Sequence, residues 1–171
     1  TTTTISAELD SAVARTWRLT LKLSTTNATW KVLATLNNPE TPYNWYPVNL
    51  LYKNAIPVKP STKYKFTCWA KTNNVATSSV SVNIQMYWVT WTRNSQNITN
   101  TLSWTNDWTL LSRAITTWAS DAFAYVIMTN NVAWNVSDAW FDVNSMTLEE
   151  VIEPVANSLI TPSPSLVSFT A

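Results

Sequence analysis

The chain has 171 residues, of which 46% are hydrophobic and 12% charged, and its net charge of +1 offers no electrostatic footprint for nucleic acid. It contains no histidine, which excludes Ser-His-Asp and Cys-His catalysis and histidine metal sites. Its one cysteine excludes an intrachain disulfide, and no apolar run is long enough for a membrane helix. These bounds indicate one domain with a substantial core.

The predicted elements are all strands, because apolar and polar side chains alternate with period two along the chain. In residues 18–24, three leucines alternate with Arg, Thr and Lys. Similar patterns predict strands at residues 63–72, 79–87, 108–117, 122–129 and 139–143. Asn-rich turns separate these segments, and none of them carries an apolar stripe with helical spacing. The pattern predicts an all-β fold, an antiparallel β-sandwich.

The domain boundary is expected near residue 153, where the strand pattern ends. Residues 1–153 form the predicted sandwich, and residues 154–171 contain three prolines and a TPSP run typical of a linker. The last residues, SLVSFTA, have the composition of a first strand in a following domain. The sequence has no signal-peptide pattern and no initiator Met, so we expect a segment of a longer chain.

The chain has 11 tryptophans and no glycine, although a chain of average composition contains about 7% glycine. Turns between strands need residues that adopt positive φ, and glycine does so without steric cost. The codon UGA is read as Trp in some bacterial codes and as Gly in others. We therefore hypothesise that glycine occupies, in the organism, the positions of the tryptophans found at strand ends and in turns: Trp17, Trp30, Trp88, Trp91, Trp104, Trp118 and Trp134.

This hypothesis predicts that several of the seven residues adopt positive φ. The alternative is that they are true tryptophans in exposed loops, acting as sugar-stacking platforms or as a belt at a membrane interface. Their scatter over many turns argues against one shared site. The other four tryptophans lie in strands or beside aromatic residues and are assigned as Trp: Trp45, Trp69, Trp108 and Trp140.

With glycine at the seven positions, three stretches resemble carbohydrate-binding modules of the four/nine type. KPSTKYKFTCWAKTNNV resembles the family strand P-x-x-x-Y-x-F-S-x-W/Y-x-K-T, and TNDWTLLSRAITT resembles x-x-W-x-x-x-S-x-x-F/I-T. AFAYVIMTNNVAWNVSDAWFDVNSMTLEE resembles the last pair of strands. The resemblance covers about residues 12–150 and implies a galactose-binding-like β-jelly roll.

The sequence departs from the family pattern in two places. No N-G-x-F-E strand precedes Ala12, so either Glu8 or Asp10 replaces its acid or the strand lies upstream. The run FDVNSM differs from the usual DDVSL, which leaves the register between Val143 and Met146 open.

Sugar recognition requires aromatic faces that stack on pyranose rings, with amides that bind hydroxyl groups. If Tyr64, Phe66 and Cys68 face the core, alternation places an aromatic and amide set on the opposite face: Trp69, Asn83, Gln85 and Tyr87. Trp45 and Tyr46 lie in the preceding loop and either form a wall of this cleft or close one end of the core. The alternative for the set is an ordinary, partly exposed sheet surface.

The resemblance also implies a structural calcium ion, with Asp142 on the last strand as one ligand. Calcium takes six to eight oxygen ligands, and the sequence offers only Glu8 or Asp10 as a second acid. The alternative is that Asp142 is a solvated or hydrogen-bonded strand acid.

A pair of carboxylates can hydrolyse glycosides, but the available acids are typical of turns and solvated surfaces, so we expect no enzyme. The acids considered are Asp107, Asp121, Asp138 and Asp142. The sequence predicts a noncatalytic module of a larger exported or cell-surface protein, binding a polysaccharide or glycan, without nucleic acid or membrane insertion. The alternative is a structural or adhesive β-sandwich spacer without sugar affinity.

Overall fold

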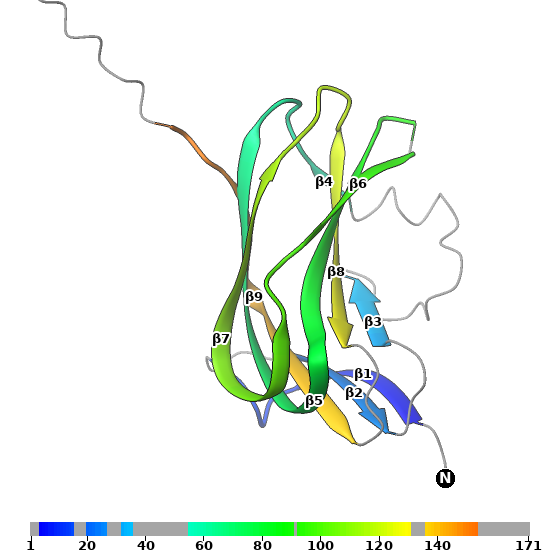
Figure 1. Ribbon diagram of the computed structural model, residues 1–171, viewed down its shortest axis with the longest axis vertical. Helices are drawn as coiled ribbons and strands as arrows, with labels where there is room; N and C mark the ends of the chain where they lie inside the picture. The colour runs from blue at the N-terminus through cyan, green and yellow to red at the C-terminus, as the bar shows by residue number, and fades with distance from the viewer. Residues whose placement is uncertain are drawn as a thin grey trace, which may run out of the picture.

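The computed structural model describes residues 4–15, 20–26, 32–35, 55–90, 92–130 and 136–153. These residues form nine antiparallel strands (Figure 1): β1 Thr4–Asp10, β2 Thr20–Thr26, β3 Val32–Thr35, β4 Ile56–Pro57, β5 Lys63–Tyr87, β6 Arg93–Ile98, β7 Leu102–Thr116, β8 Phe123–Asn130 and β9 Ser137–Glu150. Within the described ranges there is no helix long and apolar enough to cross a membrane. The predicted all-β, antiparallel sandwich is confirmed.

Strand β5 is the longest strand and belongs to both layers of the sandwich. Its first half pairs with β9 and β7, from Tyr64 opposite Glu150 to Asn73 opposite Asp138. Its second half, Val80 to Tyr87, pairs with β8, and its last residues also pair with β6. One layer therefore has the order β1-β2-β9-β5-β7, and the other has β6-β5-β8 with β3 and β4 on β8. In Figure 1, β5 passes from one layer to the other at one end of the molecule.

The core lies between the layers, where alternate side chains of both halves of β5 meet. The inward residues form one cluster with side chains from β2, β7, β8 and β9. Those from β5 are almost fully buried: Phe66, Cys68, Ala70, Val80, Val82, Ile84 and Met86. Each large apolar side chain stabilises the fold by about 1.5–3 kcal/mol through burial. Burial also raises the pKa of the Cys68 thiol, and the nearby Asp142 carboxylate raises it further.

The structure describes both segments in which the sequence departs from the family pattern. A first strand, β1, pairs with β2 along its whole length, from Thr4 opposite Thr26 to Asp10 opposite Thr20. The register of β9 against β5 shifts between Thr67 and Trp69, where the four residues 143–146 of β9 bulge out. The departure of FDVNSM from the family run thus coincides with an irregularity in the strand.

The end of β9 is fastened to the start of β5. The backbone N–H of Val151 donates to the carbonyl of Lys63 at 2.8 Å, and Lys59 and Lys63 form ion pairs with Glu150 and Glu153. The predicted linker, residues 154–171, lies outside the described residues.

Candidate functional site

The outer face of the second layer carries the predicted amides. Gln85 lies opposite Gln96 of β6 on one side and Tyr125 of β8 on the other, so these three side chains cross the sheet in one row. Asn83 and Tyr87 lie two residues away along β5 and therefore point to the same side. We call this surface the amide face: Asn83, Gln85, Tyr87, Gln96 and Tyr125.

The polar groups of the amide face are only partly satisfied. The Tyr87 hydroxyl donates a hydrogen bond of 2.7 Å to Oε1 of Gln85. In contrast, Oδ1 of Asn83 is buried and has no hydrogen-bond partner among the described residues. Leaving a buried acceptor unpaired costs about 1–3 kcal/mol, and such groups are few in native folds. Oδ1 of Asn83 is therefore a buried acceptor that no described residue satisfies.

The amide face is open at one side and closed at the other. On β6, Gln96 is exposed and the neighbouring Ile98 is 43% exposed. Toward β8 the side chains are buried although they point away from the core, with exposed fractions of 9% for Asn83 and 7% for Gln85. A ligand approaching over β6 would meet Gln96 and the half-buried Tyr87 first.

Trp69 does not join the amide face, contrary to the prediction. It points outward from the first layer, whereas Asn83 points outward from the second, because β5 changes layer between them. Trp69 and Asn83 are separated by an even number of positions on β5, and both point away from the core, yet they lie on opposite outer faces of the sandwich. The Trp69 ring is covered by the Arg15 guanidinium, 4.6 Å from the ring centroid. Trp45 and Tyr46 lie outside the described residues.

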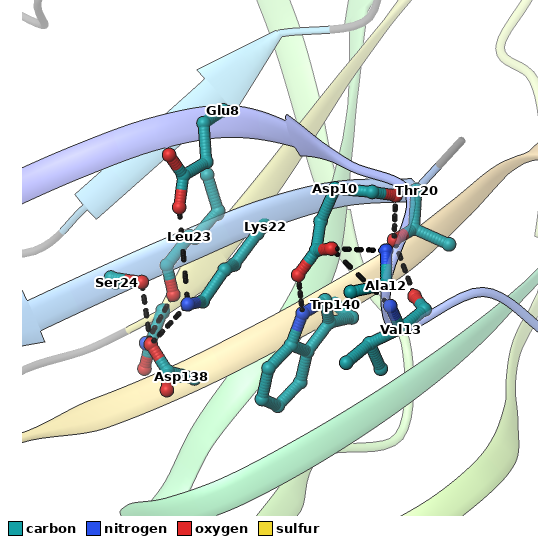
Figure 2. Close-up of polar contacts among 11 residues, drawn as sticks. Glu8, Asp10, Ala12, Val13, Thr20, Lys22, Leu23, Ser24, Asp138 and Trp140 are labelled. Carbon is teal, nitrogen blue, oxygen red and sulfur yellow. Dashed lines mark hydrogen bonds and ion pairs between the residues drawn. The ribbon is translucent and has the colours of Figure 1, made fainter.

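A polar network covers the outer face of β1, β2 and β9 (Figure 2). The indole N–H of Trp140 donates to Oδ2 of Asp10 at 2.9 Å, and the ammonium group of Lys22 lies 5.5 Å from the Trp140 ring centroid. Lys22 also forms ion pairs with Glu8 at 3.8 Å and Asp138 at 3.5 Å. The ring of Trp140, like that of Trp69, is thus engaged by a cation and does not form an open stacking platform.

Asp10 organises the turn that follows β1. Its Oδ1 accepts hydrogen bonds from the backbone N–H groups of Ala12 and Val13, at 2.7 and 3.2 Å. The hydrogen bond from Trp140 and these two backbone bonds together lower the pKa of Asp10, against a smaller opposing effect of burial. The Thr20 hydroxyl donates to the Val13 carbonyl at 2.8 Å and closes the turn against β2.

The predicted metal ligands do not meet. Glu8 lies on β1 and Asp142 on β9, with β2 between them, and each acid contacts its own cation. Lys22 pairs with Glu8, and the Nε atom of Arg15 lies 3.1 Å from Oδ2 of Asp142. In the described part of the chain no three His, Cys, Asp or Glu residues are grouped so as to hold a metal ion. These residues therefore do not supply the oxygen shell that calcium requires.

The four acids considered for glycoside hydrolysis have structural partners. Asp107 pairs with Lys71 at 2.8 Å, and Asp138 accepts a hydrogen bond from Ser24 at 2.5 Å. The buried Asp121 accepts bonds of 2.7 Å from the Asn94 amide and from the backbone N–H of Trp118. The fourth acid, Asp142, contacts Arg15 as described above.

A cavity of about 420 Å³ lies at the loop end of the sandwich, away from the central row of the amide face. The exposed Trp88 forms part of its wall beside mostly apolar residues: Val58, Pro60, Val89, Thr90, Ala119, Ser120, Asp121 and Ala122. Its polar lining residues are Thr90, Ser120 and Asp121, and both carboxylate oxygens of Asp121 already accept hydrogen bonds from the Asn94 amide and the Trp118 backbone.

Three of the seven tryptophans assigned to glycine positions are described: Trp88, Trp104 and Trp118. All three are exposed, and none belongs to the core. Trp104 has φ of 64°, in the left-handed region that favours glycine, and it is 65% exposed where the pairing of β5 and β7 shifts register. Trp88 and Trp118 are not among the residues with positive φ. The expectation is therefore met at one of three positions.

Sequence reasoning missed Gln96 and Tyr125. Gln96 lies in RNSQNI, which has no apolar alternation, so β6 was not predicted. Tyr125 lies in FAYVIMTN, whose nearly continuous apolar composition indicates a strand buried on both faces. The available signal was the tyrosine itself, because its hydroxyl requires a polar neighbour when it is buried.

Solved structures share this architecture. A structure named "Family 16 Carbohydrate Binding Module-2" superposes with a TM-score of 0.59 and 18% identity, covering 85% of this chain and 86% of its own. The described residues therefore share the β-sandwich fold of that structure. A second match, at a TM-score of 0.52 and 12% identity, is the Clostridium thermocellum xylanase 10B CBM22-1-GH10 structure complexed with xylohexaose; it covers 86% of this chain and 24% of its own.

The bacteriophage CBA120 tailspike protein 4 also matches, with a TM-score of 0.53 and 8% identity, covering 87% of this chain and 18% of its own. This chain thus matches less than a quarter of the length of the xylanase and tailspike chains. No protein-family model and no curated protein sequence matches the chain. At these identities the similarity establishes the fold of the chain alone, and its function has to be argued from its own residues.

Proposed function

We propose that this chain is a noncatalytic module that binds a polysaccharide or glycan across the amide face. The observation that carries the proposal is the buried Oδ1 of Asn83, which lacks a partner among the described residues and belongs to a face with two further amides and two tyrosines. A sugar hydroxyl is a donor of the size and polarity that such an oxygen accepts.

The chemistry of this face favours a neutral glycan. The outward-facing rows of Asn83, Gln85 and Tyr87 contain amide, phenol and apolar side chains across β6, β5 and β8. Among the described residues of these three rows, Arg93 is the only charged one. Amides form hydrogen bonds with hydroxyl groups as donors and acceptors, and a tyrosine ring packs on the C–H face of a pyranose. A glycan running across the strands would contact the Gln96, Gln85 and Tyr125 row.

Affinity electrophoresis in gels that contain neutral soluble polysaccharides tests this assignment. We expect the native module to be retarded and Gln96→Ala to lose at least about tenfold in affinity. Trp69→Ala is the matched control, because it removes an aromatic ring from the opposite outer face and should leave retardation unchanged. Loss of binding in Trp69→Ala with full binding in Gln96→Ala would move the site to the first layer.

The second candidate is a structural or adhesive spacer without sugar affinity. It is favoured by one observation, the burial of Asn83, Gln85 and Tyr125 on a face that a binding module would present to its ligand. A spacer would show no retardation on any polysaccharide while unfolding cooperatively as an intact domain.

We further propose that the module belongs to a longer exported or cell-surface chain, as the family resemblance implies. An antibody raised against the module should then label intact cells or detect the protein in the culture medium. Detection only after lysis would contradict this placement.

We also propose that Trp104 and the other six turn tryptophans stand where the organism inserts glycine. The absence of glycine from 171 residues and the φ of 64° at Trp104 support this proposal. Peptide masses of the natural protein test it at each position separately. Masses that match Trp at all seven positions would overturn it.

A further inference from the structure

Asp142 is a buried carboxylate on the outer side of the first layer. Its side chain is only 2% exposed, and Oδ2 lies 3.1 Å from Nε of Arg15. The second oxygen, Oδ1, is buried without a hydrogen-bond partner in the described part of the chain. A buried charge is costly unless it is paired, so the stability of this region depends on the cation beside Asp142.

The turn after β1 brings Arg15 to this position. Asp10 caps the backbone of Ala12 and Val13, and Thr20 bonds the Val13 carbonyl, so the segment 11–15 folds back along the outer side of the sheet. The Arg15 guanidinium then lies between two groups of different strands, the Asp142 carboxylate of β9 and the Trp69 ring of β5. The planar guanidinium of an arginine suits this position, because it can pair with a carboxylate and stack on an aromatic face at the same time.

We propose that Arg15 is a built-in cation that compensates Asp142 in place of the calcium ion expected from the family resemblance. Arg15 occupies Oδ2, and the acid offered as the second calcium ligand, Glu8, pairs with Lys22 instead. The described residues hold no group of three metal-binding side chains near Asp142. The arginine fastens the 11–15 segment to β5 and β9, and folding of the module therefore does not depend on calcium.

Thermal unfolding in excess calcium and in excess chelator tests this inference on the native module. We expect the same midpoint in both solutions, since a bound ion would stabilise the folded state by mass action. Terbium, a calcium mimic excited through nearby tryptophans, should show no saturable luminescence on the module. A higher midpoint in calcium that Asp142→Asn abolishes would overturn the proposal.

Two variants test whether the contribution of Arg15 to stability depends on the charge of Asp142. Arg15→Ala should lower the midpoint by about 10 °C, because it leaves the buried carboxylate unpaired. The double variant Arg15→Ala/Asp142→Asn should recover part of this loss, since the uncompensated charge is gone. Equal unfolding midpoints for the single and the double variant would show that Arg15 does not compensate Asp142. If Arg15→Ala fails to fold, the calcium, chelator and terbium measurements on the native module still decide the question.

Discussion

Gln85 and Tyr125 lie directly opposite each other on β5 and β8, both buried and both pointing away from the core. Inward neighbours on the same two strands, such as Ile84 and Val126, fill the space between the layers. This part of the second layer is therefore buried on both faces, one apolar and one partly polar. The partly polar face is the one on which the two proposed functions differ, because a binding module must present it to a ligand and a spacer need not.

Asn83 offers a test that separates stability from binding. Asn83→Ala removes a buried oxygen that has no partner among the described residues, so the free energy of unfolding should change by no more than about 1 kcal/mol. Glycan affinity should fall about tenfold, because the acceptor for the ligand is lost. Urea unfolding and calorimetric titration with the retarding polysaccharide measure the two effects.

Asn130 is the matched control for this experiment. It also has a buried, unpaired Oδ1 among the described residues, but its Nδ2 donates to the Leu23 carbonyl at 3.1 Å. Asn130→Ala should therefore destabilise the fold by about 1–3 kcal/mol through the orphaned carbonyl. A similar loss of stability in both variants would mean that Asn83 is structural.

The hydrogen bond from Trp140 to Asp10 should appear in the acid unfolding of the module. The pKa of Asp10 is lower in the folded state than its ordinary value of 3.8, so its contribution to stability is complete above that value. The contribution is lost as the pH falls through the folded pKa. Trp140→Phe removes the largest cause of the shift and should flatten the pH dependence of the unfolding free energy below about pH 4. If the pH dependence below about pH 4 is the same in Trp140→Phe as in the native protein, the hydrogen bond from Trp140 to Asp10 does not persist in solution.

Cys68 should be inert in the folded protein. Burial raises the pKa of its thiol, so hardly any thiolate, the reactive form, is present at neutral pH. Alkylation by iodoacetamide should proceed only through unfolding and become rapid in denaturant. Fast modification of the native module would mean that the core between β5 and β9 opens locally.

Trp104→Gly should not destabilise the module, although it removes a large side chain. Trp104 is exposed, and a left-handed conformation costs a residue with a Cβ about 1–2 kcal/mol relative to glycine. Trp140→Gly is the contrasting variant, because Trp140 is buried and hydrogen-bonded, and it should lose at least about 3 kcal/mol. Comparable losses in both would show that Trp104 is a packed, genuine tryptophan.

Alternation was sufficient to predict the sandwich and its core, since a half-buried strand buries every second side chain. It placed Val82 and Ile84 inward and Asn83 and Gln85 on one outer face. It failed for Trp69, because period two defines the two sides of a strand but not the layer to which the strand belongs. Residues 63–72 and 79–87, predicted as separate strands, form one strand that changes layer.

The ion pairs were likewise beyond prediction from one sequence. Arg15 and Asp142 are 127 positions apart, and only the turn made by Asp10 and Thr20 brings them together. The long-range pairing of β9 with both β2 and β5 completes the site. No local sequence pattern predicts a contact between residues so far apart in the chain.

The continuity of β5 has a consequence for how the module folds and fails. Because β5 supplies hydrogen-bonded partners to both layers, we expect the two layers to unfold together. Its partners β7, β8 and β9 all follow it in the chain, and pairs such as Tyr64 and Glu150 are far apart in the sequence, so pairing is non-local and folding should be slow. In a tethered protein under tension, we expect such a domain to resist the force as one mechanical unit and to unfold in a single step.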